Sequence, residues 1–260
     1  PVISQGSVTA VTMSEDGAPI AWNPPVLTAS DTEASPLVWS VLSHPSHGLA
    51  TVSGTGRSPS VFTYEPTPNF SGTDSFVLKV SDGNESDEMT INLTINSVKD
   101  VPVIAEGSII YVSMSEDGTP SPWISPEFTA SDGDGDLLTW DLLFSANHGI
   151  ATVAGSGSTP SVLSYVPSQD FAGTDRFVIK VSDGIYSAAV TIEVSVTQVN
   201  DSPVIPEGSF VNSTMSVNGH ILPWSPPKVT ARDVDGDPLT WSLRKSPAHG
   251  TATVEGFGGA

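Results

Sequence analysis

The chain lacks cysteine and is poor in basic residues. Its 260 residues include no cysteine, and 9 Lys and Arg stand against 29 Asp and Glu. Without cysteine there is no disulfide framework, so any domains must be held together by their hydrophobic cores alone. The formal net charge of −20 argues against nucleic acid or an anionic membrane surface as a partner, because both would be repelled. The same charge attracts divalent cations.

Long apolar runs and helical patterns are also missing. No apolar run is long enough to span a bilayer, so we expect no direct membrane insertion in this segment. No stretch shows the apolar spacing of a helix. Hydrophobic residues make up 38% of the chain, and 23 Gly and 22 Pro are spread through turn-like segments. We therefore expect packed cores built from strands.

The sequence repeats itself with a fixed period. Ser14-Glu15-Asp16-Gly17 returns as Ser115-Glu116-Asp117-Gly118, and the shift is 115 minus 14, or 101 residues. Trp39 returns at the same spacing as Trp140 and Trp241. A repeat of this length lies within the usual size of an independently folding domain.

The period predicts three domains. We assign residues 1–99 to the first repeat, residues 100–200 to the second, and residues 201–260 to the N-terminal part of a third, incomplete repeat. The third repeat lacks counterparts of the later strands. Half a sandwich exposes strand edges, so we expect the missing strands to come either from further residues of the same chain or from another subunit by strand addition.

The end of each repeat shows the clearest strand pattern. In the second repeat the apolar side chains at alternate positions are Val190, Ile192, Val194 and Val196, which predicts a strand with one face in a core. The preceding turn, Ser182-Asp183-Gly184, predicts a hairpin with the strand before it. Weaker strand patterns occur at 109–114, 137–143, 150–153 and 162–166.

About seven strands in about 100 residues fit a Greek-key sandwich. We therefore predict an all-β fold of tandem Greek-key β-sandwich modules of the immunoglobulin or cadherin-like type. The linker between modules is short and contains proline, which restricts the angle between neighbours. The modules should therefore lie end to end as a rod.

A recurring string of residues resembles a known family. In the second repeat it consists of Tyr165, Pro167, Phe171, Gly173-Thr174-Asp175, Phe177, Val181 and Ser182-Asp183-Gly184. This string, which also occurs in the first repeat, resembles the tandem cadherin-like and immunoglobulin-like repeats of large bacterial surface proteins. The resemblance implies an extracellular or cell-surface, multi-repeat protein whose modules bind calcium near their junctions.

Two loops have the chemistry of a calcium site. They are Asp132-Gly133-Asp134-Gly135-Asp136 and Asp233-Val234-Asp235-Gly236-Asp237. Calcium takes six to eight oxygen ligands, and alternating Asp in a tightly turning loop aims several carboxylates at one point. The first repeat keeps only Asp31 and Glu33 there. The alternative interpretation is a solvated acidic loop.

The resemblance to cadherins also implies which residues would hold the ion at each junction. At the first junction they are Glu15, Asp16, Asp74, Asp100, Asp132, Asp134 and Asp136. At the second junction they are Glu116, Asp117, Asp175, Asn200, Asp201, Asp233, Asp235 and Asp237. Lys99 stands where the second junction has Asn200, and the third repeat has Val217-Asn218 in place of Glu-Asp. We therefore expect the second junction to be the better site, with the weak affinity of extracellular modules, ~10⁻⁴–10⁻³ M.

No group of residues predicts catalysis. The histidines at 47, 148 and 249 occur singly in equivalent His-Gly turns of separate repeats, so they cannot form one site. We expect a chain that is not an enzyme. Trp39, Trp140 and Trp241 have the phase of buried core residues, whereas the position of Trp22 and Trp123 stays open.

These observations predict a structural or adhesive stalk segment of an extracellular repeat protein or filament. Its partners would be further repeats of the same protein, other copies in a homopolymer, or a surface protein or polysaccharide. The alternative is an array of carbohydrate-binding modules. Exposure of Trp22 or Trp123 would favour sugar binding, and burial of both would favour the stalk.

Overall fold

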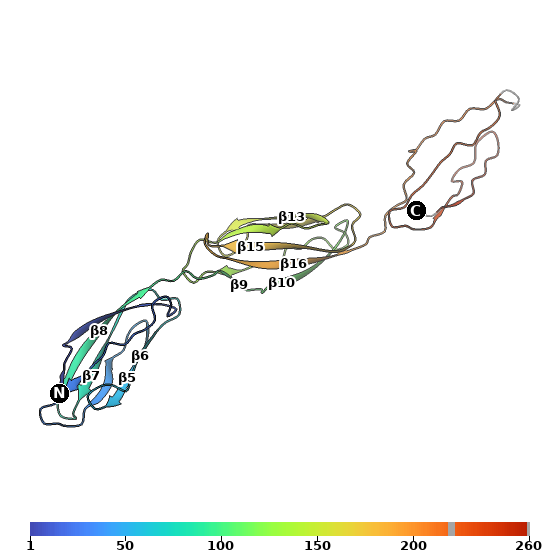
Figure 1. The fold of residues 1–260 in the computed structure, drawn as a ribbon. Coiled ribbons are helices and arrows are strands. Elements are labelled where there is room, and N and C mark those ends of the chain that lie inside the picture. Colours follow the sequence, from blue (N-terminus) through green and yellow to red (C-terminus); the bar gives the residue numbers. More distant parts are fainter. Residues whose placement is uncertain (218–221, 259–260) are drawn as a thin grey trace.

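The computed structural model describes residues 1–217 and 222–258. Three modules lie end to end, each joined to the next by a single extended segment (Figure 1). The predicted all-β fold of tandem modules is confirmed in the first two modules. In the described part of the chain there is no helix of the length and apolarity that crossing a membrane requires.

The first module contains eight strands. They are β1 (Val2–Ile3), β2 (Val8–Ser14), β3 (Ala29–Ser30), β4 (Val38–Ser43), β5 (Gly48–Thr55), β6 (Val61–Pro66), β7 (Gly72–Ser81) and β8 (Ser86–Asn96). Six of them form a sheet in the order β2-β8-β7-β4-β5-β6, and β1 pairs with β3. Only two residue pairs join β4 to β5. The β5-β6 hairpin is therefore only weakly paired with the other four strands of the sheet.

The second module repeats this topology strand for strand. Its strands are β9 (Val103–Ile104), β10 (Ile109–Ser115), β11 (Ala130–Ser131), β12 (Thr139–Phe144), β13 (Gly149–Ser156), β14 (Val162–Pro167), β15 (Gly173–Ser182) and β16 (Ser187–Thr197). The hairpin predicted around Ser182-Asp183-Gly184 is present, because β15 pairs with β16 in antiparallel register from Gly173 to Ser182.

One pairing was not predicted from the sequence. The early strands β2 and β10 pair in parallel with β8 and β16, the last strands of their modules. A turn at Gly6 and at Gly107 separates each early strand from the two-residue strand before it. Both glycines have positive φ, 86° and 91°, which side chains disfavour. This turn lets the two segments pair with different strands.

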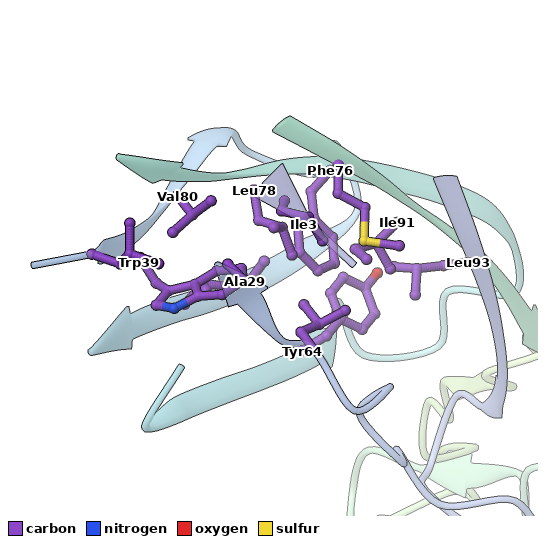
Figure 2. Packing of buried hydrophobic residues seen from close by; sticks show 14 of the residues in the cluster. Ile3, Ala29, Trp39, Tyr64, Phe76, Leu78, Val80, Ile91 and Leu93 are labelled. Atoms are coloured by element: carbon purple, nitrogen blue, oxygen red, sulfur yellow. The ribbon is translucent and has the colours of Figure 1, made fainter. Parts of the chain in front are cut away.

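The core of each module lies between the inward faces of the strands. In Figure 2 the side chains of Trp39, Tyr64, Phe76 and Ile91 point toward one another from separate strands of the first module. The Trp39 side chain is 2% exposed, and its Nε1 donates a 3.0 Å hydrogen bond to the Gly56 carbonyl. The predicted core position of this tryptophan is therefore confirmed, as it is for Trp140.

Trp22 and Trp123 are half-buried against the same cores. The Trp22 ring lies edge-on to Phe62 at 5.7 Å between centroids, and its Nε1 donates a 3.4 Å hydrogen bond to the Phe62 carbonyl. The Trp123 ring lies 5.8 Å from that of Tyr165. Neither indole stands free as a flat platform, because each rests on aromatic side chains of its own module.

The third module contains little regular structure among residues 201–217 and 222–258. Two short strands, β17 (Leu239–Thr240) and β18 (Phe257–Gly258), pair with each other, and Val204 forms a bridge with Arg232. Here the core position predicted for Trp241 is wrong, because this side chain is half-buried. Of the predicted Val217-Asn218 pair, Asn218 lies outside the described residues.

Candidate metal centre at the module junctions

Each linker is fixed to both of its neighbours by hydrogen bonds from its backbone amides to side-chain carboxylates. At the first junction the Val98 amide donates a 2.7 Å bond to Glu15 Oε1 in the module before it. Two residues later the Asp100 amide donates a 2.8 Å bond to Asp134 Oδ2 in the module after it. The linker therefore holds one acid of each module at a fixed place beside its own Asp100.

The second junction has the same two bonds. The Val199 amide donates a 2.7 Å bond to Glu116 Oε1, and the Asp201 amide donates a 2.6 Å bond to Asp235 Oδ2. The Gln198 side chain adds a 2.6 Å bond from its Nε2 to Asp235 Oδ1. The 101-residue repeat thus extends from the modules to the geometry of the junctions.

The Asp-rich loops turn around the side chain of their first aspartate. Asp132 Oδ1 accepts the Asp136 amide at 3.0 Å. Asp233 Oδ1 accepts the amides of Asp235 and Asp237 at 3.1 and 3.3 Å. An aspartate that bonds amides two and four residues ahead stabilises a tight turn. This turn aims the later carboxylates toward the linker.

Oxygen ligands converge at both junctions. At the second junction Glu116, Asp201 and Asp235 each offer a carboxylate oxygen, and these atoms lie within 4.8 Å of one another. They come from the end of one module, the linker and the next module, so a cation held among them would tie all three segments together. The oxygens of Asp132, Asp134 and Asp136 form a second group at the same mutual distance beside the first junction.

The electrostatics of Asp201 show how crowded the second junction is. Burial raises the pKa of the Asp201 carboxyl above its ordinary value, and nearby negative charges raise it further. The residues that supply these charges are Asp117, Asp170, Asp235 and Glu116, in decreasing order of effect. An acid whose ionised form is disfavoured by burial and by like charges is stabilised by a bound cation.

Asp100 has the corresponding environment at the first junction. Burial raises the pKa of its carboxyl, and the negative charges of Asp16, Asp134, Glu15 and Asp132 add to the shift. The structure therefore brings together most of the acids predicted for each junction. These include Asp16 and Asp117, whose charges act on the linker aspartates.

Two carboxylate oxygens at these sites have no hydrogen-bond partner among the residues that the structure describes. They are Oδ2 of Asp201 and Oδ2 of Asp132, and both atoms are shielded from solvent. A buried, unpaired carboxylate oxygen is costly, because it has lost water without gaining a donor. Carboxylate oxygens are the ligands that calcium prefers, so these donor sets fit that ion.

Sequence reasoning missed Asp170 and its equivalent, Asn69. Asp170 acts on the pKa of Asp201, and Asn69 Nδ2 would lie 2.9 Å from a Cβ atom added at Gly133 in the loop of the next module. The two residues share a left-handed backbone, with φ of 57° and 60°. Asn and Asp are enriched in that conformation. An Asn or Asp directly before Phe70 and Phe171 was therefore the feature of the sequence that could have indicated these turn residues.

Asp74 and Asp175, both predicted ligands, have another role in the structure. Asp175 Oδ1 accepts the amides of Asn147 and Arg176, and Oδ2 accepts the His148 amide and the Tyr165 hydroxyl. Asp74 makes the equivalent four bonds in the first module. Their oxygens accept hydrogen bonds within one module. Among the described residues, the groups of carboxylates that lie close enough to share a metal ion do not include them.

The remaining predicted residues lie at the edge of these sites. The Asn200 side chain donates a 2.9 Å hydrogen bond from its Nδ2 to the Asp201 carbonyl. Asp237 contributes its amide to the loop turn, while Asp136 forms an ion pair of 2.6 Å with Lys99. The two junctions therefore differ most at the residue before the linker aspartate.

The family model for the bacterial Ig domain matches residues 1–94 and again residues 99–197. The chain belongs to the bacterial Ig domain family. No curated protein sequence matches it significantly.

Solved structures that are similar to this chain include cadherins. Extracellular cadherin domains 1–5 of protocadherin gamma B2 are similar with a TM-score of 0.52 and 18% identity, over 90% of this chain and 46% of that one. Domains 1–4 of protocadherin gamma B7 give a TM-score of 0.42 at 15% identity, over 97% and 65%. An endo-fucoidan hydrolase of glycoside hydrolase family 107 gives 0.30 at 21% identity, over 74% of this chain and 28% of that one. This bacterial Ig chain thus spans about a quarter to two thirds of the length of these proteins. At 18% identity the likeness to protocadherin gamma B2 concerns the fold alone.

Proposed function

We propose that this chain is a stalk segment of an extracellular or cell-surface repeat protein, and that calcium stiffens its module junctions. The observation on which the proposal depends is the convergence of Glu116, Asp201 and Asp235 from three separate segments. A cation bound there resists bending, because any change in the angle between modules would pull a ligand away from it.

The linkers support a spacer role. Each donates one backbone amide to a carboxylate of the module before it and one to a carboxylate of the module after it. Such a linker resists reorientation, unlike a Gly/Ser-rich tether. In a stalk the modules need no active centre, and the histidines support this view: the His47 ring stacks on Phe70 with centroids 4.0 Å apart, and its amide binds Asp74. We therefore propose a structural protein and not an enzyme.

Extracellular calcium suits this role better than the intracellular ion. Modules of this kind bind with Kd in the range of ~10⁻⁴–10⁻³ M, which only extracellular calcium concentrations reach. The partners proposed for such a stalk are further repeats of the same protein, other copies, or a surface protein or polysaccharide. Packing of Trp22 and Trp123 onto aromatic core residues supports the stalk over an array of sugar-binding platforms.

The test is thermal unfolding of the full chain with excess calcium and with chelator, combined with calcium titration by calorimetry. We expect calcium to raise the melting temperature, because it binds the folded junction and not the unfolded chain. The Asp235→Ala variant should lose most of this rise. Glu88→Gln, which removes an exposed carboxylate within the first module, is the matched control and should keep it. An unchanged melting temperature with no binding heat would exclude the calcium-stiffened stalk.

A further inference from the structure

The two junctions share a backbone but differ in one charge. At the first junction Lys99 Nζ lies 2.6 Å from Asp136 Oδ2 and 3.9 Å from Asp134 Oδ2. The equivalent residue at the second junction is the neutral Asn200, whose amide group bonds the backbone of Asp201. The Asp-rich loop of the second module therefore has a protein cation at its carboxylates, and the described contacts give the loop of the third module none.

The lysine is placed by the same linker that fixes the carboxylates. Val98 and Asp100, on either side of Lys99, are bonded to Glu15 and Asp134. The ammonium is therefore held beside the loop by two anchored neighbours, and its effective concentration there is high without any free ion. The Lys99 and Asp136 side chains are 42% and 35% exposed, so solvent partly screens their contact, whereas the Asp134 side chain, 3.9 Å from the ammonium, is 6% exposed.

The charge balance of the two sites differs accordingly. The first junction gathers six carboxylates, from Glu15, Asp16, Asp100, Asp132, Asp134 and Asp136, and one ammonium, a formal charge of −5. The second gathers seven, from Glu116, Asp117, Asp170, Asp201, Asp233, Asp235 and Asp237, a formal charge of −7. More uncompensated negative charge both repels the modules and attracts a divalent ion.

We propose that Lys99 is a built-in cation that substitutes for part of the calcium at the first junction. The first junction then keeps its geometry without calcium and binds the ion weakly, whereas the second needs free calcium to become rigid. This inference rests on the proposed function only in that it takes calcium to stiffen the second junction. The rod thus has one permanently stiff joint and one joint that responds to calcium.

The absence of cysteine permits a direct test in the full chain. Thr51, Thr152 and Thr253 are exposed and occupy equivalent positions in the three modules. Spin labels on Thr51→Cys with Thr152→Cys span the first junction, and labels on Thr152→Cys with Thr253→Cys span the second. Pulsed electron resonance then gives the distribution of distances across each junction, with chelator and with excess calcium.

In the unmodified background we expect a narrow distribution across the first junction under both conditions. Across the second junction we expect a narrow distribution only with calcium. Lys99→Asn should broaden the distribution of distances across the first junction in chelator, and calcium should make this distribution narrow again. Asn200→Lys should narrow the second distribution in chelator. Lys99→Arg should behave as the original chain, and Lys79→Asn, which removes a lysine within β7, is the control for loss of charge alone.

Calcium titration supplies an independent measurement. The Lys99 ammonium repels a divalent ion a few ångströms away. Its removal in Lys99→Asn should therefore strengthen calcium binding at the first junction about tenfold, for charges that interact in a water-like medium. A first junction that is equally narrow in Lys99→Asn and in the original chain with chelator would overturn the inference. Failure of the proposed function looks different: no variant would bind calcium, while Lys99→Asn would still broaden the first junction.

Discussion

The Tyr165 hydroxyl donates a 2.9 Å hydrogen bond to Oδ2 of Asp175, across two strands of the second module. Asp175 also binds the backbone amides of Asn147 and His148, so its carboxylate joins β14, β15 and the turn that precedes β13. The Asp175 side chain is 2% exposed. This buried, fully bonded carboxylate stabilises the end of the module that leads to the linker.

Asp175→Asn should destabilise the second module by about 2–3 kcal/mol. The amide replaces one acceptor oxygen by a donor, which leaves buried donors without partners, and bonds to charged groups are the costlier ones to lose. Calorimetry of the full chain should show one unfolding transition moving to lower temperature. Asp74→Asn should move the other transition instead, and equal movement of both by either variant would contradict the independence of the modules.

The same carboxylate predicts a dependence on pH. Burial opposes ionisation of Asp175, but the amide donors of Asn147, His148 and Arg176 outweigh it and hold its pKa below the ordinary value of 3.8. The stability it provides is therefore complete above pH 3.8 and is lost as the pH falls through the lower folded-state pKa. In urea denaturation, the difference in free energy of unfolding between the original chain and Asp175→Asn should therefore shrink as the pH falls through this acidic range. A difference in unfolding free energy that increased on acidification would refute this prediction.

Asp201 should show the opposite behaviour. Its pKa is raised by burial and by the neighbouring acids, so without calcium its ionised form disfavours the folded junction. Its favourable contribution is present below its ordinary pKa of 3.8 and is lost as the pH rises through the folded-state value. In chelator, Asp201→Asn should therefore unfold at a higher temperature than the original chain at neutral pH, with no difference in acid. Excess calcium should reverse the order at neutral pH.

Asp170 provides a test of the residue that the sequence reasoning missed. Asp170→Asn should weaken calcium binding at the second junction about tenfold, because one carboxylate is lost from the group around Asp201. The matched change, Asn69→Asp, should strengthen binding at the first junction. Titration calorimetry measures both. Unchanged affinity in the two variants would place this residue outside the site.

Gly133 should be needed for the close approach of the linker at the first junction. A Cβ atom there would clash with the Asp100 carboxylate and lie 2.9 Å from Asn69 Nδ2. Gly133→Ala should therefore broaden the distances measured across this junction while the module cores keep their melting temperatures. Gly135→Ala is a useful comparison, because its added Cβ would meet no atom within 4 Å, although its φ of 73° makes the loop itself strained.

The sequence predicted the fold well because its signal was local and repeated. The alternation from Val190 to Val196 gives the inward face of β16, and the 101-residue period marks equivalent strands. The parallel pairing of β10 with β16 could not be predicted this way. It joins segments about 80 residues apart in the chain, and alternation indicates which face of a strand is buried but not which strand lies beside it.

The sequence by itself determined the module type, the repeat and the acidic composition of the junctions. The tertiary structure alone decided which acids meet. Asp74 and Asp175 have the same residue type as the linker aspartates, yet their carboxylates are used by amides and a tyrosine hydroxyl inside one module. Asp170, by contrast, is brought to Asp201 across the fold. Metal ligation and ion pairing depend on distances of a few ångströms, and such distances between residues far apart in the chain are set only when the strands pack.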